Sequence, residues 1–470
     1  MKKVKLVPLL IILAVAVLIF FVKPFNLDSQ GAFILASLIF TVAAWATQAI
    51  HKTWASLYLL LVFMLWGNTP PLEVINFLWS PSMLLIISTS ILSLAIVQSR
   101  VLEKPLAKAL RWSAAKTSRI LFLPYILGLV LIFIIPQAFA RVSILGTLLF
   151  SLLQGGSEEA KEVRSVIIFH ACLAITMTYM FFTTGDIVLN GSALNFSGAA
   201  VAAELDFSSW FKYMSIPTLF TCLGVIGLTY LLFRKEFQAF GPQMLALTRK
   251  ESEEEKSPES SQTGEAEKSK KLLFVISLIL LVIAWMTESI HGVAPWICTV
   301  VVLLLAYLLG YLKADALKAV NPNFLIFLTA AFSIAKVLAN TGVTEKIFEY
   351  LQELLPQGSG QSFLILCAAL VMLLHLFIGS SVATLSVTLP ILLPIAEKRG
   401  ISGAIICLIF YFVVNVHFLL PFHHATMMLG AGQGYYQDKH MLRFGIPMTA
   451  ITLIFLYLFY YPWWQFLGLI

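Results

Sequence analysis

The chain has 470 residues, of which 59% are hydrophobic and 12% are charged, whereas a soluble protein carries about 25% charged residues. This composition excludes a soluble globular enzyme and indicates an integral membrane protein. The net charge of +7 lies in short loops without an aromatic-rich basic patch, so nucleic acid is not an expected partner. The five cysteines lie in apolar stretches without metal-ligand spacing, so we expect no disulfide, metal or cofactor.

Apolar segments that can cross the bilayer run along the whole chain. The first ends near Val22 without a small-residue cleavage site and is predicted to be an uncleaved span. A helix needs about 20 residues to cross the hydrocarbon. Further spans are predicted near 32–50, 54–67, 81–98, 165–185, 211–233, 272–290, 294–311, 322–340, 401–420 and 443–468. The predicted fold is an all-α polytopic membrane protein with about eleven transmembrane helices.

Two more apolar stretches, 118–153 and 361–397, are too long for one span each. Each is predicted to form a re-entrant helical hairpin, because non-helical backbone at that depth needs protein or a wet cavity around it. The alternative is that each forms two ordinary kinked helices. The interruptions are Pro136-Gln137-Ala138 and Gly379-Ser380-Ser381.

Basic loops predict the orientation in the membrane. Those at 100–119, 234–235 and 439–443 all fall on the side of the N-terminus. The positive-inside rule places the N-terminus in the cytoplasm and the C-terminus outside, across the inner (plasma) membrane. A polar segment, 235–271, is predicted to be a disordered cytoplasmic linker between an N-terminal half, 1–234, and a C-terminal half, 272–470.

The two halves resemble each other. A W-x-T-[Q/E]-x-I-H motif begins at Trp45 and again at Trp285, 240 residues later, and the hairpins fall at matching places. On the predicted spans, the two copies cross the membrane in opposite directions, so the repeat is inverted. An inverted repeat brings two equivalent hairpin tips together near the membrane centre, which is typical of a secondary transporter.

The hairpin tips carry the first candidate residues. Ser380, Ser381 and Thr384 offer hydroxyl and carbonyl oxygens suited to a hard cation such as sodium. Alternatively, these hydroxyls only bond back to their own helices. Arg141 follows the first tip, and a guanidinium at that depth needs a partner. That partner is either a carboxylate of the substrate or Asp186, and the sequence leaves both open.

A segment interrupted by Gly or Pro follows each hairpin, the best sequence indication of a transporter site. In the first, 183–195, Asn190, Ser192 and Asn195 could present oxygens and amides to a substrate. In the second, 417–425, His423 and His424 could donate to an anion or titrate near neutral pH. Structural roles are expected for the histidines at 51, 170, 291, 375 and 417. The chain lacks a P-loop and nucleophile motifs, which disfavours an ATP-driven pump.

At these motifs the chain resembles the divalent anion:sodium symporter family of the ion transporter superfamily, from about residue 30 to the C-terminus. The resemblance implies a dimerising scaffold domain, a transport domain that carries both hairpins, and an elevator mechanism for dicarboxylates, tricarboxylates or sulfate. The chain departs from the family's S-N-T at the first tip, which reads Gln137-Ala138-Phe139. The motifs that carry the resemblance are Ser380-Ser381-Val382-Ala383-Thr384, placed as the family's S-N-T-A-T, Leu420-Pro421, Gly430-Ala431-Gly432, Lys439, Met441-Leu442 and Gly445-Ile446-Pro447.

The tips, the interrupted segments and the resemblance together give two sets of candidate residues. The predicted substrate-binding residues are Gln137, Ala138, Arg141, Asn190, Ser192, Asn195, Ser380, Ser381, Thr384, His423 and His424. The predicted sodium-binding residues are Pro136, Gly191, Ser192, Asn195, Gly379, Ser380, Ala383 and Ala425.

The predicted function is secondary active transport of a small anion, coupled to sodium, by a homodimer in contact with membrane lipid. Coupling to protons, or anion exchange, is an alternative because the first tip is altered and His423 and His424 are present. An alternative of another class is a membrane enzyme that acts on lipid-linked substrates, but such an enzyme needs no pair of equivalent tips. We expect the chain not to be an enzyme.

Overall fold

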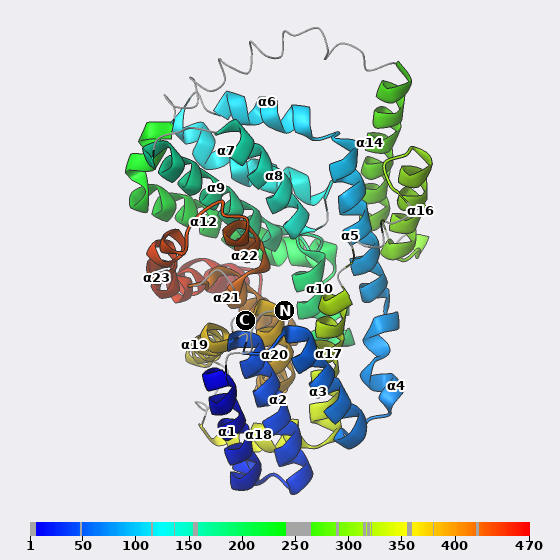
Figure 1. Cartoon of the computed structure of the whole chain (residues 1–470). Helices are drawn as coiled ribbons and strands as arrows, with labels where there is room; N and C mark the ends of the chain where they lie inside the picture. Colours follow the sequence, from blue (N-terminus) through cyan, green and yellow to red (C-terminus); the bar gives the residue numbers. More distant parts are fainter. Residues whose placement is uncertain are drawn as a thin grey trace.

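A computed structural model describes residues 6–47, 49–113, 116–135, 137–153, 158–240, 265–287, 291–313, 316, 320, 322–354, 360–378, 380–419 and 423–470. The described residues form helices, short turns and loops, and no strand. The predicted all-α class is therefore confirmed. Figure 1 shows α1, α2, α3, α17 and α18 gathered at one end and α6, α7, α8, α14 and α16 at the other.

The first half contains the helices α1 (Leu6–Val22), α2 (Ser29–Thr47), α3 (Lys52–Trp66), α4 (Pro71–Val74), α5 (Pro81–Ser99), α6 (Glu103–Ser113), α7 (Thr117–Ile132), α8 (Ala138–Leu152), α9 (Glu158–Thr178), α10 (Ile187–Ser197), α11 (Ala199–Glu204) and α12 (Phe207–Leu232). The second contains α14 (Glu265–Met286), α16 (Pro295–Leu308), α17 (Pro322–Asn340), α18 (Val343–Leu354), α19 (Gln361–Ile378), α20 (Ser381–Lys398), α21 (Gly403–Val416), α22 (Ala425–Gly432), α23 (Asp438–Phe455) and α24 (Tyr461–Phe466).

Local sequence explains where several helices begin. The Ser80 hydroxyl accepts from the Met83 amide over 3.1 Å, and Pro81 occupies the first turn of α5. The Asp206 carboxylate accepts from the Ser209 amide over 2.7 Å at the start of α12. Both side chains satisfy amides that have no partner inside the helix.

Four helices of the described residues are long and apolar enough to cross a bilayer: Glu158–Phe181, Phe207–Leu232, Ser381–Lys398 and Asp438–Phe466. Nine shorter apolar helices accompany them, and α5 with α6 forms a pair bent by 77°. The count of eleven spans stays a prediction. Ser381–Lys398 is an arm of the second predicted hairpin, so length and composition do not tell a span from a re-entrant arm.

Each predicted hairpin stretch folds into two helices that pack on one central helix. The arms α7 and α8 both contact α9, and the arms α19 and α20 both contact α21. This packing is compatible with a hairpin and with two kinked helices, so the re-entrant hairpins stay a prediction. The core lies at these central helices, because every residue of α21 is buried.

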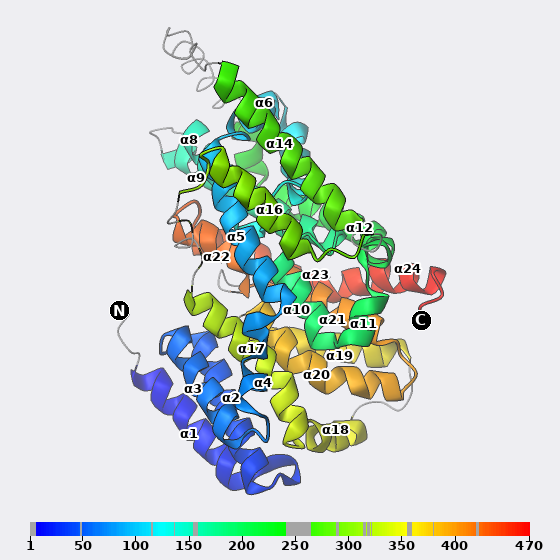
Figure 2. The same ribbon diagram turned by 90° about the vertical axis from the view of Figure 1, so that its right-hand side faces the viewer.

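The two halves exchange packing partners. α5 packs on α16, and α17 packs on α3, which are equivalent pairs in the order of the two halves. Figure 2 shows α5 beside α16 and α17 beside α3. Likewise α10 packs on α20, and α22 packs on α8. The equal order of helices and these reciprocal contacts support an internal repeat, and its inversion relative to the membrane stays a prediction.

The prediction of a disordered linker over 235–271 is wrong at both ends of that range, because both ends are helical. Residues 234–240 are helical, and α14 begins at Glu265. Phe237 and Phe240 are buried in the core, and Phe237 packs edge-on against the ring of His170. The burial of these two aromatic side chains stabilises residues 234–240 as a helix, although the charged residues around them predicted disorder. Residues 241–264 lie outside the described residues, so this part of the linker prediction is not tested.

Candidate functional site

The two interrupted segments predicted from the sequence lie against each other. α9 ends at Thr178, a 3-10 turn follows over Tyr179–Phe181, and α10 begins at Ile187. In the second half α21 ends at Val416, and α22 begins at Ala425. The hydroxyls of Thr176 and Thr426 lie 2.8 Å apart. The Tyr179 hydroxyl lies 3.1 Å from Nδ1 of His424. The end of α9 and the start of α22 therefore belong to one buried polar region.

Arg141 lies in this region and is fully buried. Its guanidinium donates to the carbonyl oxygen of Ile135, over 3.2 Å, and to that of Gly185. Its Nε has no hydrogen-bond partner among the described residues. Asp186 is close enough for the two charges to interact, but no ion pair within 4 Å joins these two described side chains. The Asp186 carboxylate instead accepts from the Val188 amide, at the start of α10.

Gly185 holds the carbonyl that Arg141 uses. Its amide donates to the Phe182 carbonyl oxygen over 2.9 Å, which closes a turn before α10. A Cβ on Gly185 would overlap the carbonyl oxygen of Tyr179. Only glycine therefore allows the turn that presents this carbonyl to the guanidinium.

The other first-tip candidates serve helix contacts. The Gln137 amide donates to the Ser90 hydroxyl of α5 over 2.6 Å. Ala138 is buried as the first residue of α8. Pro136 lies outside the described residues. The first tip is thus tied to α5 by Gln137 and to the interrupted segment by Arg141.

Asn190 holds the first interruption together. Its amide nitrogen donates to the Phe182 carbonyl oxygen over 2.7 Å, and its Oδ1 accepts from the Tyr411 hydroxyl. The Ser192 hydroxyl bonds back to Val188 of its own helix. Asn195 is exposed and donates to the Gly191 carbonyl oxygen over 2.7 Å. The four predicted residues of α10 therefore do not converge on one point.

At the second tip, one of the predicted hydroxyls reaches across the site. The Ser381 hydroxyl lies 3.4 Å from Nε2 of His375 and donates to the carbonyl oxygens of Val414 and His423, both over 3.2 Å. Thr384 bonds back to the Ser380 carbonyl oxygen over 2.9 Å. Ala383 is buried. Gly379 lies outside the described residues, and Ala425 begins α22.

Four buried histidines gather beside Ser381, which the sequence did not predict. His375 comes from the last turn of α19, and the other three come from the second interruption, His417, His423 and His424. The ring of His375 lies 5.6 Å from that of His417, 5.1 Å from that of His423 and 6.3 Å from that of His424. No group of His, Cys, Asp or Glu in the described part of the chain has the geometry to hold a metal ion.

Sequence reasoning missed Tyr179, Tyr411, His375 and His417 as members of the polar region. All four are buried and face other polar groups. Their position in the sequence could have indicated them. Each lies close to an interruption of an apolar run, where a polar side chain can reach backbone groups that lack a helical partner.

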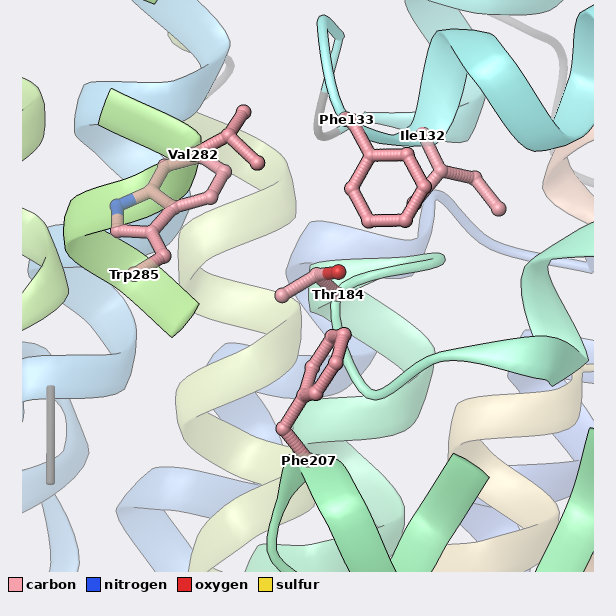
Figure 3. A pocket seen from close by; sticks show the side chains of 6 residues that line it. All are labelled: Ile132, Phe133, Thr184, Phe207, Val282 and Trp285. Carbon is pink, nitrogen blue, oxygen red and sulfur yellow. The ribbon is translucent and has the colours of Figure 1, made fainter. Parts of the chain in front are cut away.

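An apolar hollow also adjoins the first tip (Figure 3). Ile132 and Phe133, at the end of α7, face Thr184 and Phe207, with α14 across the hollow. Its lining holds one side-chain hydroxyl, that of Thr184, and no charged group. A site for a small anion needs more polar groups than this, so the hollow is not the candidate site.

Comparison with known proteins identifies the family. The model of the sodium:sulfate symporter transmembrane region matches residues 3–470. The chain belongs to this family. A membrane protein of Cupriavidus necator is 22% identical over 485 aligned residues, covering 98% of this chain and 91% of the relative. The sodium-dependent dicarboxylate transporter SdcS of Staphylococcus aureus is also 22% identical, with coverage of 97% and 89%.

The fold has a solved counterpart. The YdaH transporter of Alcanivorax borkumensis superposes with a TM-score of 0.53 at 15% identity, covering 94% of this chain and 99% of that chain. At this identity the likeness concerns the fold alone. With the family shown, the chain is an integral membrane transporter and not an enzyme, so the lipid-linked enzyme drops out as an alternative.

Proposed function

We propose that the chain is a secondary active transporter that moves a small anion together with sodium across the plasma membrane. The family and the sodium-dependent dicarboxylate relative support this reading. The proposed substrates are dicarboxylates, tricarboxylates or sulfate. The N-terminus is proposed to lie in the cytoplasm and the C-terminus outside.

The main support for an anionic substrate is that the buried Arg141 guanidinium lacks a matching charge and one acceptor. A buried guanidinium is costly unless its charge and its five donors are matched. Arg141 uses two carbonyl oxygens, has no carboxylate within ion-pair distance among the described residues, and keeps Nε without a partner. A carboxylate or sulfate oxygen would supply both the missing charge and the missing acceptor. This favours the substrate over Asp186 as the main partner of Arg141.

The elevator mechanism and the homodimer are part of the proposal. The first hairpin packs on α9 and the second on α21, and Thr176 and Tyr179 of the first half bond to Thr426 and His424 of the second, as expected of one moving body. Ser381, at the second tip, supplies the hydroxyl that we assign to substrate or coupling-ion contact.

The test is uptake of labelled succinate, citrate and sulfate into proteoliposomes, with sodium and proton gradients imposed separately. We expect accumulation of at least one of these anions under an inward sodium gradient. Uptake that ignores sodium and needs a counter-anion inside would replace symport by exchange. Absence of uptake under every gradient would overturn the assignment of these anions.

A further inference from the structure

The helix α6 lies across the end of α5 instead of continuing it. α5 is about 28 Å long at 1.5 Å per residue, which is close to the thickness of the hydrocarbon. The chain then turns at Arg100, whose φ of 52° is left-handed, and the two helices are bent by 77° relative to each other. Figure 1 shows α6 crossing one end of the molecule. α6 therefore lies near the plane of the membrane surface, between the end of α5 and the start of α7.

α6 has one apolar face and one basic face. Leu106 and Leu110 are buried, and the helix packs on α7 and α8. Lys104, Lys108 and Trp112 follow one another at intervals of four residues, so their side chains share the opposite face. All three are exposed. The protein thus covers the apolar face and leaves the basic face, which we define as Lys104, Lys108 and Trp112, open to another partner.

The lysines of the basic face have no carboxylate partner in the part of the chain that the structure describes. Neither Lys104 nor Lys108 forms an ion pair there. Residues 100–116 contain five basic residues and one acidic residue, Glu103. Lys116, just before α7, is exposed as well. An anionic group is therefore the complementary ligand for this surface.

The equivalent helix of the second half carries the opposite charge. α18 follows α17 as α6 follows α5, and it contains three acidic residues and one basic residue, Lys346. Figure 1 shows α18 at the other end of the molecule. A helix at this place of the repeat thus does not require lysines, and the basic face of α6 needs a reason that is specific to its own end.

We propose that the basic face of α6 binds the headgroups of anionic phospholipids. The long side chains of Lys104 and Lys108 reach the phosphate level and donate to phosphate oxygens. The exposed ring of Trp112 suits the same level, because indole prefers the boundary between headgroups and acyl chains. A soluble acidic protein would leave this ring in water, and α5 and α7 hold α6 at the bilayer surface. On the proposed orientation, the lipids belong to the cytoplasmic leaflet. The site makes no use of the transported anion, so it can be tested without uptake.

The first experiment measures lipid binding to the full chain in detergent. Phosphatidylglycerol is titrated into the purified protein, and bound lipid is counted by native mass spectrometry. We expect the apparent Kd to be at least tenfold weaker in Lys104→Gln/Lys108→Gln, and Lys104→Arg/Lys108→Arg to bind like wild type. The matched control is Lys268→Gln/Lys270→Gln, which removes the same charge from exposed lysines of α14 at the same end of the molecule.

Equal affinity in wild type and in Lys104→Gln/Lys108→Gln would overturn the site. An equal loss in the α14 control would do so as well, because total charge would then set the binding. Phosphatidylcholine bound as tightly as phosphatidylglycerol would remove the argument from charge. Glycerol 3-phosphate presents the same phosphate without acyl chains, and if it displaces the lipid at equal concentration, the ligand is a free phosphate instead of a lipid. Size-exclusion profiles check that every variant is folded.

The second experiment locates the lipid beside α6 in a bilayer. Nanodiscs hold phosphatidylcholine with a minority of phosphatidylglycerol, and one of the two lipids carries brominated acyl chains, which quench nearby tryptophan fluorescence. The signal of Trp112 is the difference between wild type and Trp112→Phe. We expect brominated phosphatidylglycerol to quench Trp112 more than its share of the lipid predicts. This excess should vanish in Lys104→Gln/Lys108→Gln and at high salt. Quenching in proportion to the lipid composition would overturn the selectivity for anionic lipid.

Discussion

The Tyr411 hydroxyl donates a 2.7 Å hydrogen bond to Oδ1 of Asn190 and so joins α21 to α10, one helix from each half of the chain. Both residues are fully buried. In Tyr411→Phe, the amide oxygen of Asn190 would lose this donor in a place that water does not reach. We expect the free energy of unfolding to fall by about 1–3 kcal/mol.

The measurement for Tyr411→Phe is the thermal unfolding midpoint in detergent. Tyr457→Phe is the control, since Tyr457 is half exposed in the helical segment Leu456–Tyr460 that follows α23. Equal midpoints for both variants would mean that the bond between the halves adds nothing to stability.

Removal of the Arg141 guanidinium should abolish transport. We expect Arg141→Ala to lower uptake at least 100-fold, because the anion would lose its buried positive charge, and Arg141→Lys to restore only part of it, because lysine lacks the fork that reaches two carbonyls and an anion together. Arg119→Ala is the control, since Arg119 stacks on the Trp112 ring at an exposed helix. Substrate affinity unchanged in folded Arg141→Ala would reduce Arg141 to a partner of Asp186.

Gly185 should tolerate no side chain. In Gly185→Ala the new Cβ would overlap the Tyr179 carbonyl oxygen, and relief of that overlap must move the carbonyl that Arg141 uses. We expect a loss of about 1–3 kcal/mol in unfolding free energy together with weaker anion binding. Gly191→Ala, where nothing lies within 4 Å of the new Cβ, should instead gain about 0.5–1 kcal/mol in the same unfolding assay.

Asp206 should make stability depend on pH in the acid range. The amide and hydroxyl of Ser209 donate to its carboxylate and hold the pKa of Asp206 below its ordinary value. A lowered pKa contributes stability that is complete above the ordinary carboxylate pKa of about 4 and is lost as the pH falls through the lowered value.

The comparison for Asp206 is between wild type and Asp206→Asn, whose side chain still caps α12 but carries no charge. We expect the wild type to unfold at a higher temperature from pH 5 to 7, and this advantage to vanish as the pH approaches 3. Glu159→Gln, an exposed carboxylate on α9, should show no such convergence. A constant difference across the whole range would show that the charge of Asp206 contributes nothing.

The sequence predicts the helices and their breaks well because the bilayer imposes long apolar runs and makes any polar interruption visible. α7 ends at Ile132 and α8 begins at Ala138, and α19 ends at Ile378 and α20 begins at Ser381, which agrees with the predicted interruptions. The contacts of single polar residues were harder to predict. Ser192 and Thr384 bond back to their own helices, whereas Ser381 reaches across the site, and only the angle between neighbouring helices decides between these outcomes.

The histidines show the same limit. His375 lies in α19, and His424 precedes α22. Nothing in their spacing along the sequence indicates that their rings lie 6.3 Å apart. The linker bounds were wrong for another reason, because Phe237 packs on the rings of His170 in α9 and Tyr230 in α12 only after the chain has folded. Local composition carries no information about such partners.

The crossed packing of α5 on α16 and of α17 on α3 sets the order in which the protein can be built. The ribosome completes α3 and α5 long before it makes α17 and α16, which pack on them. Until then, the contact surfaces of α3 and α5 are exposed to lipid. Those faces close only when the second half arrives, and the final step of biogenesis is therefore the meeting of two halves rather than the growth of one. Two separate polypeptides, one for each half, should consequently assemble when made in the same cell.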